Sequence, residues 1–469
     1  MSVELIGIIS IIAGLIGLFS GVKASLVLMS IAAVLQSAAA LLVAGANIPP
    51  GHVVLGFLML AVLTRRQVAK ALVRELGPDR PGFWLALMVA YGILSAFFVP
   101  RLLADQTIII PLGQTIHAET GSGVPLAPVS TNITQTIYMI GNLVVFLLVA
   151  AVASTRDGLR AAVAALLAYS MATVFFAVVD LVTFSTGLQW TMEFIRNAQY
   201  ALHVDTEIAG MKRIVGSFTE ASAFARSALG VLGFSGTMWL CGRRSGLTGG
   251  LAVSSAVLVV LSTSSTGLAG APVMMMILYA TAVILVGQSH GSRIVVFAVI
   301  TAPLLTIAVV LVAALNEDLW RPAFDYINLV VLDKAGSDSG VERSAWNAYA
   351  MRNVFETGGI GLGLGTVRTS SFLVALLVSV GVPGTLLYFV FAYQALLRHQ
   401  GSFKSFEGSA RLAACNGCLG LLIGDLVVSP SVDQGLFFYI LAAVSSVGPV
   451  QAARSAETDI LELRHVYRA

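Results

Sequence analysis

Long uninterrupted apolar runs are the feature that most constrains this chain. Several of them continue for about 14 to 27 residues with at most one or two charges, and a helix of about 20 residues crosses the hydrocarbon core of a bilayer. Only 11% of the 469 residues are Asp, Glu, Lys or Arg, against roughly 25% in soluble proteins, and 57% are hydrophobic. The sequence therefore excludes a soluble globular fold and predicts an all-α, polytopic helical membrane protein.

The runs predict about 12 to 14 membrane-spanning helices in a single integral membrane domain over residues 1–469. Residues 24–45 are expected to form one of these spans, whereas residues 50–63 and 251–261 are short for a full crossing. When the 27 lysines and arginines are sorted along an alternating path, most lie on the side of residues 451–469. The positive-inside rule then predicts a cytoplasmic tail and an outward N-terminus.

Three segments on the opposite side are long, at residues 101–136, 188–220 and 316–371, whereas most cytoplasmic connections are short. Long outward segments are expected of a protein that works on an extracytoplasmic substrate. A transporter more often has short loops on both faces and repeated halves, and no convincing internal repeat is present here.

The segment at 316–371 contains Arg343, Arg352 and Arg368 on the side where basic residues are uncommon, which indicates anionic partners. A guanidinium group offers a bidentate fork to phosphate, although ion pairing within the protein is an equal alternative. In one helix, Arg343 and Arg352 would lie on opposite faces, and Arg343 would share its face with Trp346, which could stack on a sugar phosphate or anchor the loop at the membrane interface. The glycine-rich run at 358–365 does not match a nucleotide-binding loop, so it is either an anion-binding backbone nest or a turn that re-enters the membrane.

A second polar cluster precedes the apolar run at 221. Lys212 and Arg213 are expected at the outer membrane edge, and Glu220 is a candidate general base or an ion-pair partner of Arg213. Within the apolar runs, Asp180, Arg226 and Asp425 are costly unless paired, so they predict a buried network or a proton relay.

Several other chemistries have no support in the sequence. It contains no HExxH, GxSxG or DxD motif, and Cys415 and Cys418 lack a second pair or a nearby histidine, so we expect no metal site. The net charge of +3 is too small to indicate nucleic-acid binding.

Four local pieces of the sequence form a combination of moderate specificity, and together they cover about a sixth of the chain. The pieces are RIVGSFTEASAFA at 213–225, LSTSSTGLAG at 261–270, VERSAW at 341–346 and GGIGLGLGTVRTSSFLVALLVSVGVPG at 358–384. In their order, and in the long outward segment before the last piece, they resemble the O-antigen polymerase and O-antigen ligase superfamily, especially its exopolysaccharide polymerase members.

The resemblance implies a GT-C-like membrane glycosyltransferase that uses a glycan on undecaprenyl pyrophosphate as donor and needs no metal or other cofactor. It implies that Arg213 and Arg343 hold the pyrophosphate, with Arg368 a further possibility. Glu220 joins these two arginines as our catalytic candidates. Our substrate-binding candidates are Arg352, Arg368, Trp346, Lys212 and Ser370.

The sequence departs from the family where ligases commonly carry a histidine, because that place reads Thr369-Ser370-Ser371. Glu220 or His203 could replace that histidine, or transfer could depend mainly on stabilising the leaving group. The expected function is a polysaccharide polymerase in the bacterial inner membrane, acting at its outer face on lipid-linked glycan. A flippase, a chain-length regulator and export machinery follow as partners from the resemblance alone. The alternatives are an O-antigen-type ligase and a lipid-linked oligosaccharide flippase or transporter.

Overall fold

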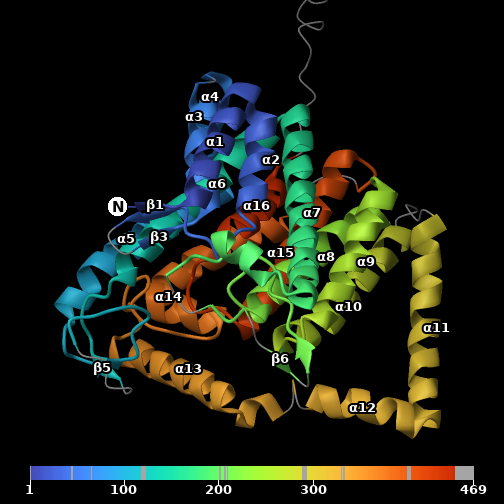
Figure 1. Cartoon of the computed structure of the whole chain (residues 1–469). Coiled ribbons are helices and arrows are strands. Elements are labelled where there is room, and N and C mark those ends of the chain that lie inside the picture. The colour runs from blue at the N-terminus through green and yellow to red at the C-terminus, as the bar shows by residue number, and fades with distance from the viewer. Residues whose placement is uncertain are drawn as a thin grey trace, which may run out of the picture.

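The computed structural model is mostly helical (Figure 1). It describes residues 2–43, 46–64, 66–117, 123–199, 202–204, 207–208, 210–287, 293–328, 330, 333–398 and 403–448. The predicted tail at 451–469 lies outside these residues. Within them, seven helices are long and apolar enough to cross a membrane. They are α5 (Pro81–Leu102), α6 (Thr131–Ala153), α7 (Arg156–Thr186), α10 (Ser265–Gly287), α11 (Arg293–Leu315), α14 (Phe372–Ala392, continued by a π turn at Tyr393–Leu397) and α15 (Phe406–Val427).

Other expected spans correspond to shorter or less apolar helices. These helices are α1 (Leu5–Ser20), α2 (Val22–Ala32), α3 (Pro50–Leu63), which with α4 (Arg66–Glu75) makes a bent pair, α8 (Ala221–Leu240), α9 (Ser245–Leu261) and α16 (Gly435–Ser446). The single span expected at 24–45 is wrong, because α2 ends at Ala32. The Ser37 hydroxyl donates to the carbonyls of Ile195 and Ser217, so distant loops hold this segment out of the helix.

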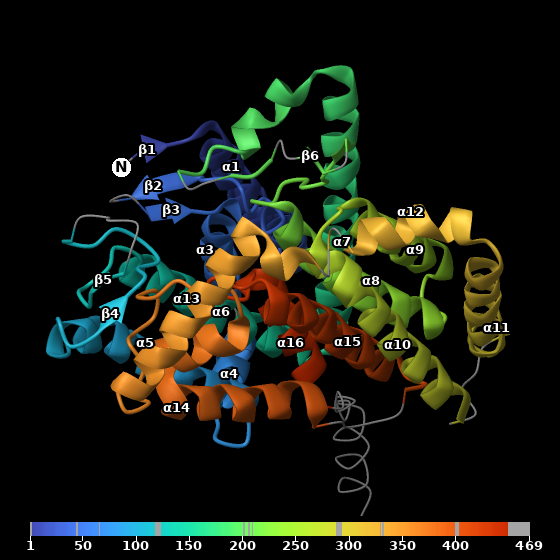
Figure 2. The ribbon, with the colours of Figure 1, turned by 90° about the horizontal axis from the view of Figure 1, so that it is seen from below.

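The remaining structure lies near the N-terminus and in the three segments that we predict to face outward. Short antiparallel pairings join β1 (Ser2–Val3), β2 (Leu41–Val43) and β3 (Ala46–Ile48), then β4 (Ile108–Ile109) with β5 (Val124–Pro125), and β6 (Glu207–Ile208) with β7 (Met211–Lys212). A 3-10 helix covers Gln189–Ile195, and another covers Asp333–Gly336. The helices α12 (Glu317–Ile327) and α13 (Asp338–Glu356) run along one end of the bundle (Figure 2).

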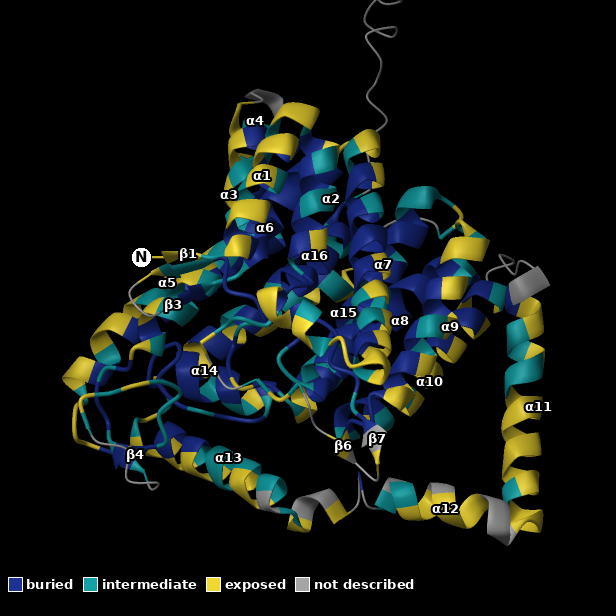
Figure 3. Cartoon of the chain, in the orientation of Figure 1, coloured by how far each residue is buried: buried dark blue, intermediate teal, exposed yellow. Residues whose placement is uncertain are grey.

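The centre of the bundle is built around α8, which packs closely against α15. Small residues allow this approach: a Cβ on Gly233 would lie 2.3 Å from the Asn416 carbonyl oxygen, and one on Gly420 would lie 2.3 Å from that of Leu229. Figure 3 shows this region buried, whereas α11 and α12 are largely exposed. An apolar helix with exposed sides is suited to contact with lipid rather than water.

The glycine-rich run connects α13 to α14 and forms hydrogen bonds with backbone groups that are left free where α14 is interrupted. Pro383 has no N–H and Gly381 has a φ of 61°, so the helix is interrupted there. Leu362 and Gly363 donate backbone N–H groups to the carbonyls of Val378 and Ser379, and Val382 donates to Gly359.

This arrangement favours the re-entrant turn over the anion-binding nest, because N–H groups needed for a nest already have carbonyl partners. Gly358, Gly359, Gly361, Gly363 and Gly365 all have positive φ, which glycine adopts without steric cost.

The contact between this turn and α14 can be tested with two glycines of similar backbone conformation. A Cβ on Gly361 would lie 2.5 Å from the Gly381 nitrogen, whereas one on Gly358 meets nothing within 4 Å. We expect Gly361→Ala to lower the free energy of unfolding by about 1–3 kcal/mol more than Gly358→Ala. Thermal unfolding in detergent measures the difference, and equal midpoints would contradict close docking at Gly361.

Candidate functional site

Three segments that are far apart in the sequence bring a cluster of charged side chains together. Arg343 comes from α13, Arg213 and Glu220 come from the segment that leads into α8, and Tyr326 comes from α12. The Arg343 Nη2 lies 3.7 Å from the Glu220 Oε2, and both side chains are partly exposed. The Ser222 hydroxyl also donates to Glu220. We call Arg213, Glu220, Tyr326 and Arg343 the arginine cluster.

Arg213 carries positive charge that its surroundings compensate only in part. Its burial lowers the pKa of the guanidinium, Glu220 and Tyr326 raise it, and the neighbouring charge of Arg343 lowers it. Arginine nevertheless stays protonated in proteins. Its Nε and the Tyr326 hydroxyl are buried, and neither has a hydrogen-bond partner among the described residues. One carboxylate thus serves two guanidinium groups, so the arginine cluster is suited to an additional anion.

Residues 368–370, which follow the glycine-rich run, contact Trp346 and Asn347 on the face of α13 that also carries Arg343. The Arg368 guanidinium lies over the Trp346 ring, 5.0 Å from its centroid. The Asn347 side-chain oxygen accepts a hydrogen bond from the Ser370 N–H at 2.9 Å. Thr369 donates to the Ser429 carbonyl at 3.2 Å, which links this segment to the loop between α15 and α16. Arg343, Trp346 and Asn347 therefore lie on one side of α13, as expected for residues three and four positions apart in a helix.

Arg352 lies away from this side and makes the internal ion pair that was the alternative for it. Its Nε donates to Glu356 Oε1 at 2.6 Å, and 71% of its side chain is exposed. The hydrogen bond from Thr107, followed by that from Arg352, lowers the pKa of Glu356. The structure thus separates Arg352 from the other substrate-binding candidates.

Lys212 also lies apart from the arginine cluster, in a buried network around Asp180. The Asp180 carboxylate accepts hydrogen bonds from Arg196 at 2.7 Å and from the backbone N–H groups of Val215 and Gly216 at 2.8 and 2.9 Å. The Lys212 Nζ lies 3.6 Å from the same carboxylate. The contacts of Asp180 thus fix the backbone on either side of Arg213, through Lys212 before it and Val215 after it. Lys212 is buried, so it has a structural role and does not face a substrate.

The second buried carboxylate predicted from the sequence is paired as well. Arg226 donates through Nη2 to Asp425 Oδ2 at 2.8 Å, and also to the Gln434 carbonyl at 2.9 Å. The prediction of a buried network at Asp180, Arg226 and Asp425 is confirmed. Pairing with cations explains why Asp180 and Asp425 can be buried, so no proton relay is needed to explain their presence.

His203 and Glu220, the two candidates to replace the missing histidine, lie in segments that are hydrogen-bonded to each other. The His203 N–H donates to the Thr219 carbonyl at 3.0 Å, and Glu220 follows Thr219 directly. The His203 side chain is exposed, whereas Glu220 contacts Arg343.

Sequence reasoning did not include Tyr326 or Arg196 among the site residues. Tyr326 is the last residue but one of the amphipathic stretch EDLWRPAFDYI, which could have marked a helix at the membrane interface. Nothing in the sequence places it near Arg213, because their proximity depends on how α12 and the segment before α8 are positioned.

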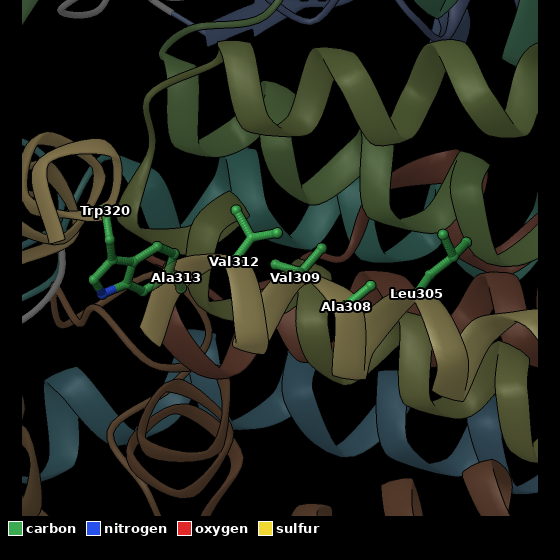
Figure 4. Close-up of a pocket in the computed structure, with 6 residues that line it drawn as sticks. All are labelled: Leu305, Ala308, Val309, Val312, Ala313 and Trp320. Atoms are coloured by element: carbon green, nitrogen blue, oxygen red, sulfur yellow. The ribbon is translucent and has the colours of Figure 1, made fainter. Parts of the chain in front are cut away.

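An apolar hollow of about 300 Å³ lies elsewhere, between α11 and the start of α12 (Figure 4). Its lining contains no acid, base or nucleophile and consists of Leu305, Ala308, Val309, Val312, Ala313 and Trp320. Across the described ranges, no three His, Cys, Asp or Glu residues are placed to hold a metal ion. The arginine cluster is therefore the better candidate for chemistry.

No family model matches this chain, and comparison with curated proteins and with solved structures finds no significant match either.

Asp180 and Asp157 provide a matched test of the buried network, because both belong to α7. We expect Asp180→Ala to lower the free energy of unfolding by about 3 kcal/mol, since it leaves buried cations without their carboxylate. Asp157 is 93% exposed and pairs only with Arg160, so Asp157→Ala should cost less than about 0.5 kcal/mol. Thermal unfolding in detergent gives both values. A similar small loss for both variants would show that Asp180 does not stabilise the fold.

Proposed function

We propose that this protein is a metal-independent membrane glycosyltransferase of the polysaccharide polymerase type. It transfers glycan from a polyprenyl diphosphate, of the undecaprenyl kind, to a hydroxyl of an acceptor glycan. In this proposal the reaction takes place at the outer face of a bacterial inner membrane, and the helical bundle is GT-C-like.

The observation that supports the proposal is the incompletely compensated positive charge of the arginine cluster. Arg213 has a buried Nε without a hydrogen-bond partner among the described residues. Glu220 pairs with Arg343 and is also the carboxylate that acts on Arg213. Planar guanidinium groups bind phosphate oxygens through paired hydrogen bonds. The stacked Arg368–Trp346 pair adds a cation and an aromatic surface suited to a sugar phosphate.

The chemistry that such a site supports is displacement of a diphosphate leaving group. The acceptor oxygen attacks the anomeric carbon while the bond from that carbon to the diphosphate oxygen breaks, and the electron pair remains on the diphosphate. Arg213 and Arg343 would stabilise the charge that develops there. Glu220 lies beside them and is the candidate to receive the acceptor proton, although its contact with Arg343 also gives it a structural role.

The membrane setting supports a lipid-linked donor. Seven long apolar helices place the protein in a bilayer, where a polyprenyl chain also resides. A flippase that supplies the donor, a chain-length regulator and export machinery are the partners that such a reaction needs. Ligation of glycan to a different lipid or protein is the nearest alternative, and it differs in its product.

Reconstitution of the purified protein with polyprenyl-diphosphate-linked oligosaccharide, without metal or nucleotide, tests this function. Wild type should give products that increase by whole repeat units. Arg343→Ala should lower the rate by about 100-fold or more, because a donor to the leaving group is lost. Arg343→Lys should retain part of the rate, since it keeps the charge but not the bidentate fork.

Arg352→Ala is the matched control, because Arg352 lies on the opposite side of the same helix and is 71% exposed. It should stay within about twofold of wild type. No products from wild type, together with faster crossing of the same lipid in sealed vesicles than in protein-free controls, would overturn the polymerase and favour a flippase. Transfer of a single glycan to another lipid would favour a ligase.

A further inference from the structure

A second group of polar side chains converges inside the bundle, away from the arginine cluster. His52 comes from α3, Asn142 from α6 and Tyr439 from α16, and Asp433 lies in the loop between α15 and α16. The helix of Tyr439, α16, packs against α6, which carries Asn142, and the His52 ring packs on α6 at Gly141. The Asn142 Nδ2 donates to Asp433 Oδ1 at 2.7 Å. We call these four residues the Asp433 cluster.

The Asp433 cluster has hydrogen-bonding capacity that the protein does not use. Both ring nitrogens of His52, the Asn142 Oδ1 and the Tyr439 hydroxyl are buried and lack a hydrogen-bond partner among the described residues. Asn142 and Tyr439 are fully buried. Leaving one such group unsatisfied costs about 1–3 kcal/mol, so their presence around one carboxylate indicates a bound polar partner.

The surrounding structure holds these groups in fixed positions. A Cβ on Gly141 would lie 2.8 Å from the His52 ring, so this glycine lets the ring pack on α6, where it also contacts the Tyr138 ring at 5.2 Å between centroids. The Gly435 N–H donates to Asp433 Oδ1 at 2.8 Å. Next to Asp433, Gln434 receives hydrogen bonds from Arg226 on its carbonyl and from Tyr388 on its side chain.

The chemistry of the Asp433 cluster favours an uncharged polyhydroxyl ligand over the diphosphate. A carboxylate repels an anionic group, whereas carboxylate, amide, phenol and imidazole together can accept from and donate to hydroxyl groups. His52 and Asp433 are each only half-buried, so the Asp433 cluster extends to the protein surface, and its unpartnered atoms lie just below that surface. Its loop is also linked to the site described above, because Ser429 accepts the hydrogen bond from Thr369, the residue after Arg368.

We propose that the Asp433 cluster binds hydroxyl groups of the acceptor glycan. This assignment rests on the proposed glycosyl transfer. It gives the two substrates separate sites, with the anionic donor head at the arginine cluster and the neutral acceptor sugar around Asp433.

The test measures the KM for an acceptor that cannot act as a donor. Mild acid releases free oligosaccharide from the lipid-linked material, and this oligosaccharide is added to the reconstituted protein at a fixed donor concentration. Asp433→Asn should raise the acceptor KM by about 10- to 100-fold, and Tyr439→Phe by about 3- to 10-fold. Binding of glycan-free polyprenyl diphosphate, measured separately, reports the donor site alone and should stay unchanged in both variants.

Tyr439→Phe keeps the inference testable if Asp433→Asn does not fold. Its hydroxyl has no hydrogen-bond partner in the described part of the protein, so removing it should not lower the unfolding midpoint. Tyr169→Phe is the control, because the Tyr169 hydroxyl lies 2.9 Å from that of Ser227. That variant should lose stability and keep the wild-type acceptor KM.

An unchanged acceptor KM in both Tyr439→Phe and folded Asp433→Asn, with active wild type, would overturn the acceptor site and leave the proposed function standing. A wild-type protein that forms no glycosidic bond would overturn both. Weaker binding of glycan-free polyprenyl diphosphate in folded Asp433→Asn would contradict the separation of the two sites.

Discussion

The structure depends on the requirement that backbone polar groups at membrane depth find partners within the protein. The break in α14 frees the Ser379 carbonyl, because Pro383 cannot donate to it, and the glycine-rich turn supplies the missing N–H group. The Val382 N–H, which also lies at the break in α14, donates to the Gly359 carbonyl of the turn. This exchange sets where the chain emerges after the turn, and therefore where Arg368, Thr369 and Ser370 meet α13.

Charge is distributed according to the same principle. Asp180 and Asp425 are almost fully buried, and each has cationic partners together with backbone or amide contacts. The arginine cluster differs, because its two guanidinium groups share one partly exposed carboxylate. Buried charges that are fully paired maintain the fold, whereas incompletely paired charge at an accessible position is available to a ligand.

The positions of the helices could be predicted from the apolar runs, since each expected span contains a helix. The end of α2 could not, because it depends on hydrogen bonds from Ser37 to residues more than 150 positions away. The sequence predicts that Asp180 needs a cation, yet Arg196 and Lys212 become its partners only after the segment at 188–220 folds over α7. The contact between Arg343 and Glu220 likewise joins residues more than 100 positions apart.

If the proposed function holds, the composition of the glycine-rich turn has a consequence for substrate selectivity. Its side chains are either absent or apolar, at Ile360, Leu362 and Leu364, and several of its N–H groups are already bonded within the protein. It therefore has little with which to distinguish one monosaccharide from another. Under the proposed glycosyl transfer, residues of α13 and the neighbouring loops would set selectivity while this turn stays the same, so one membrane scaffold would accommodate different repeat units.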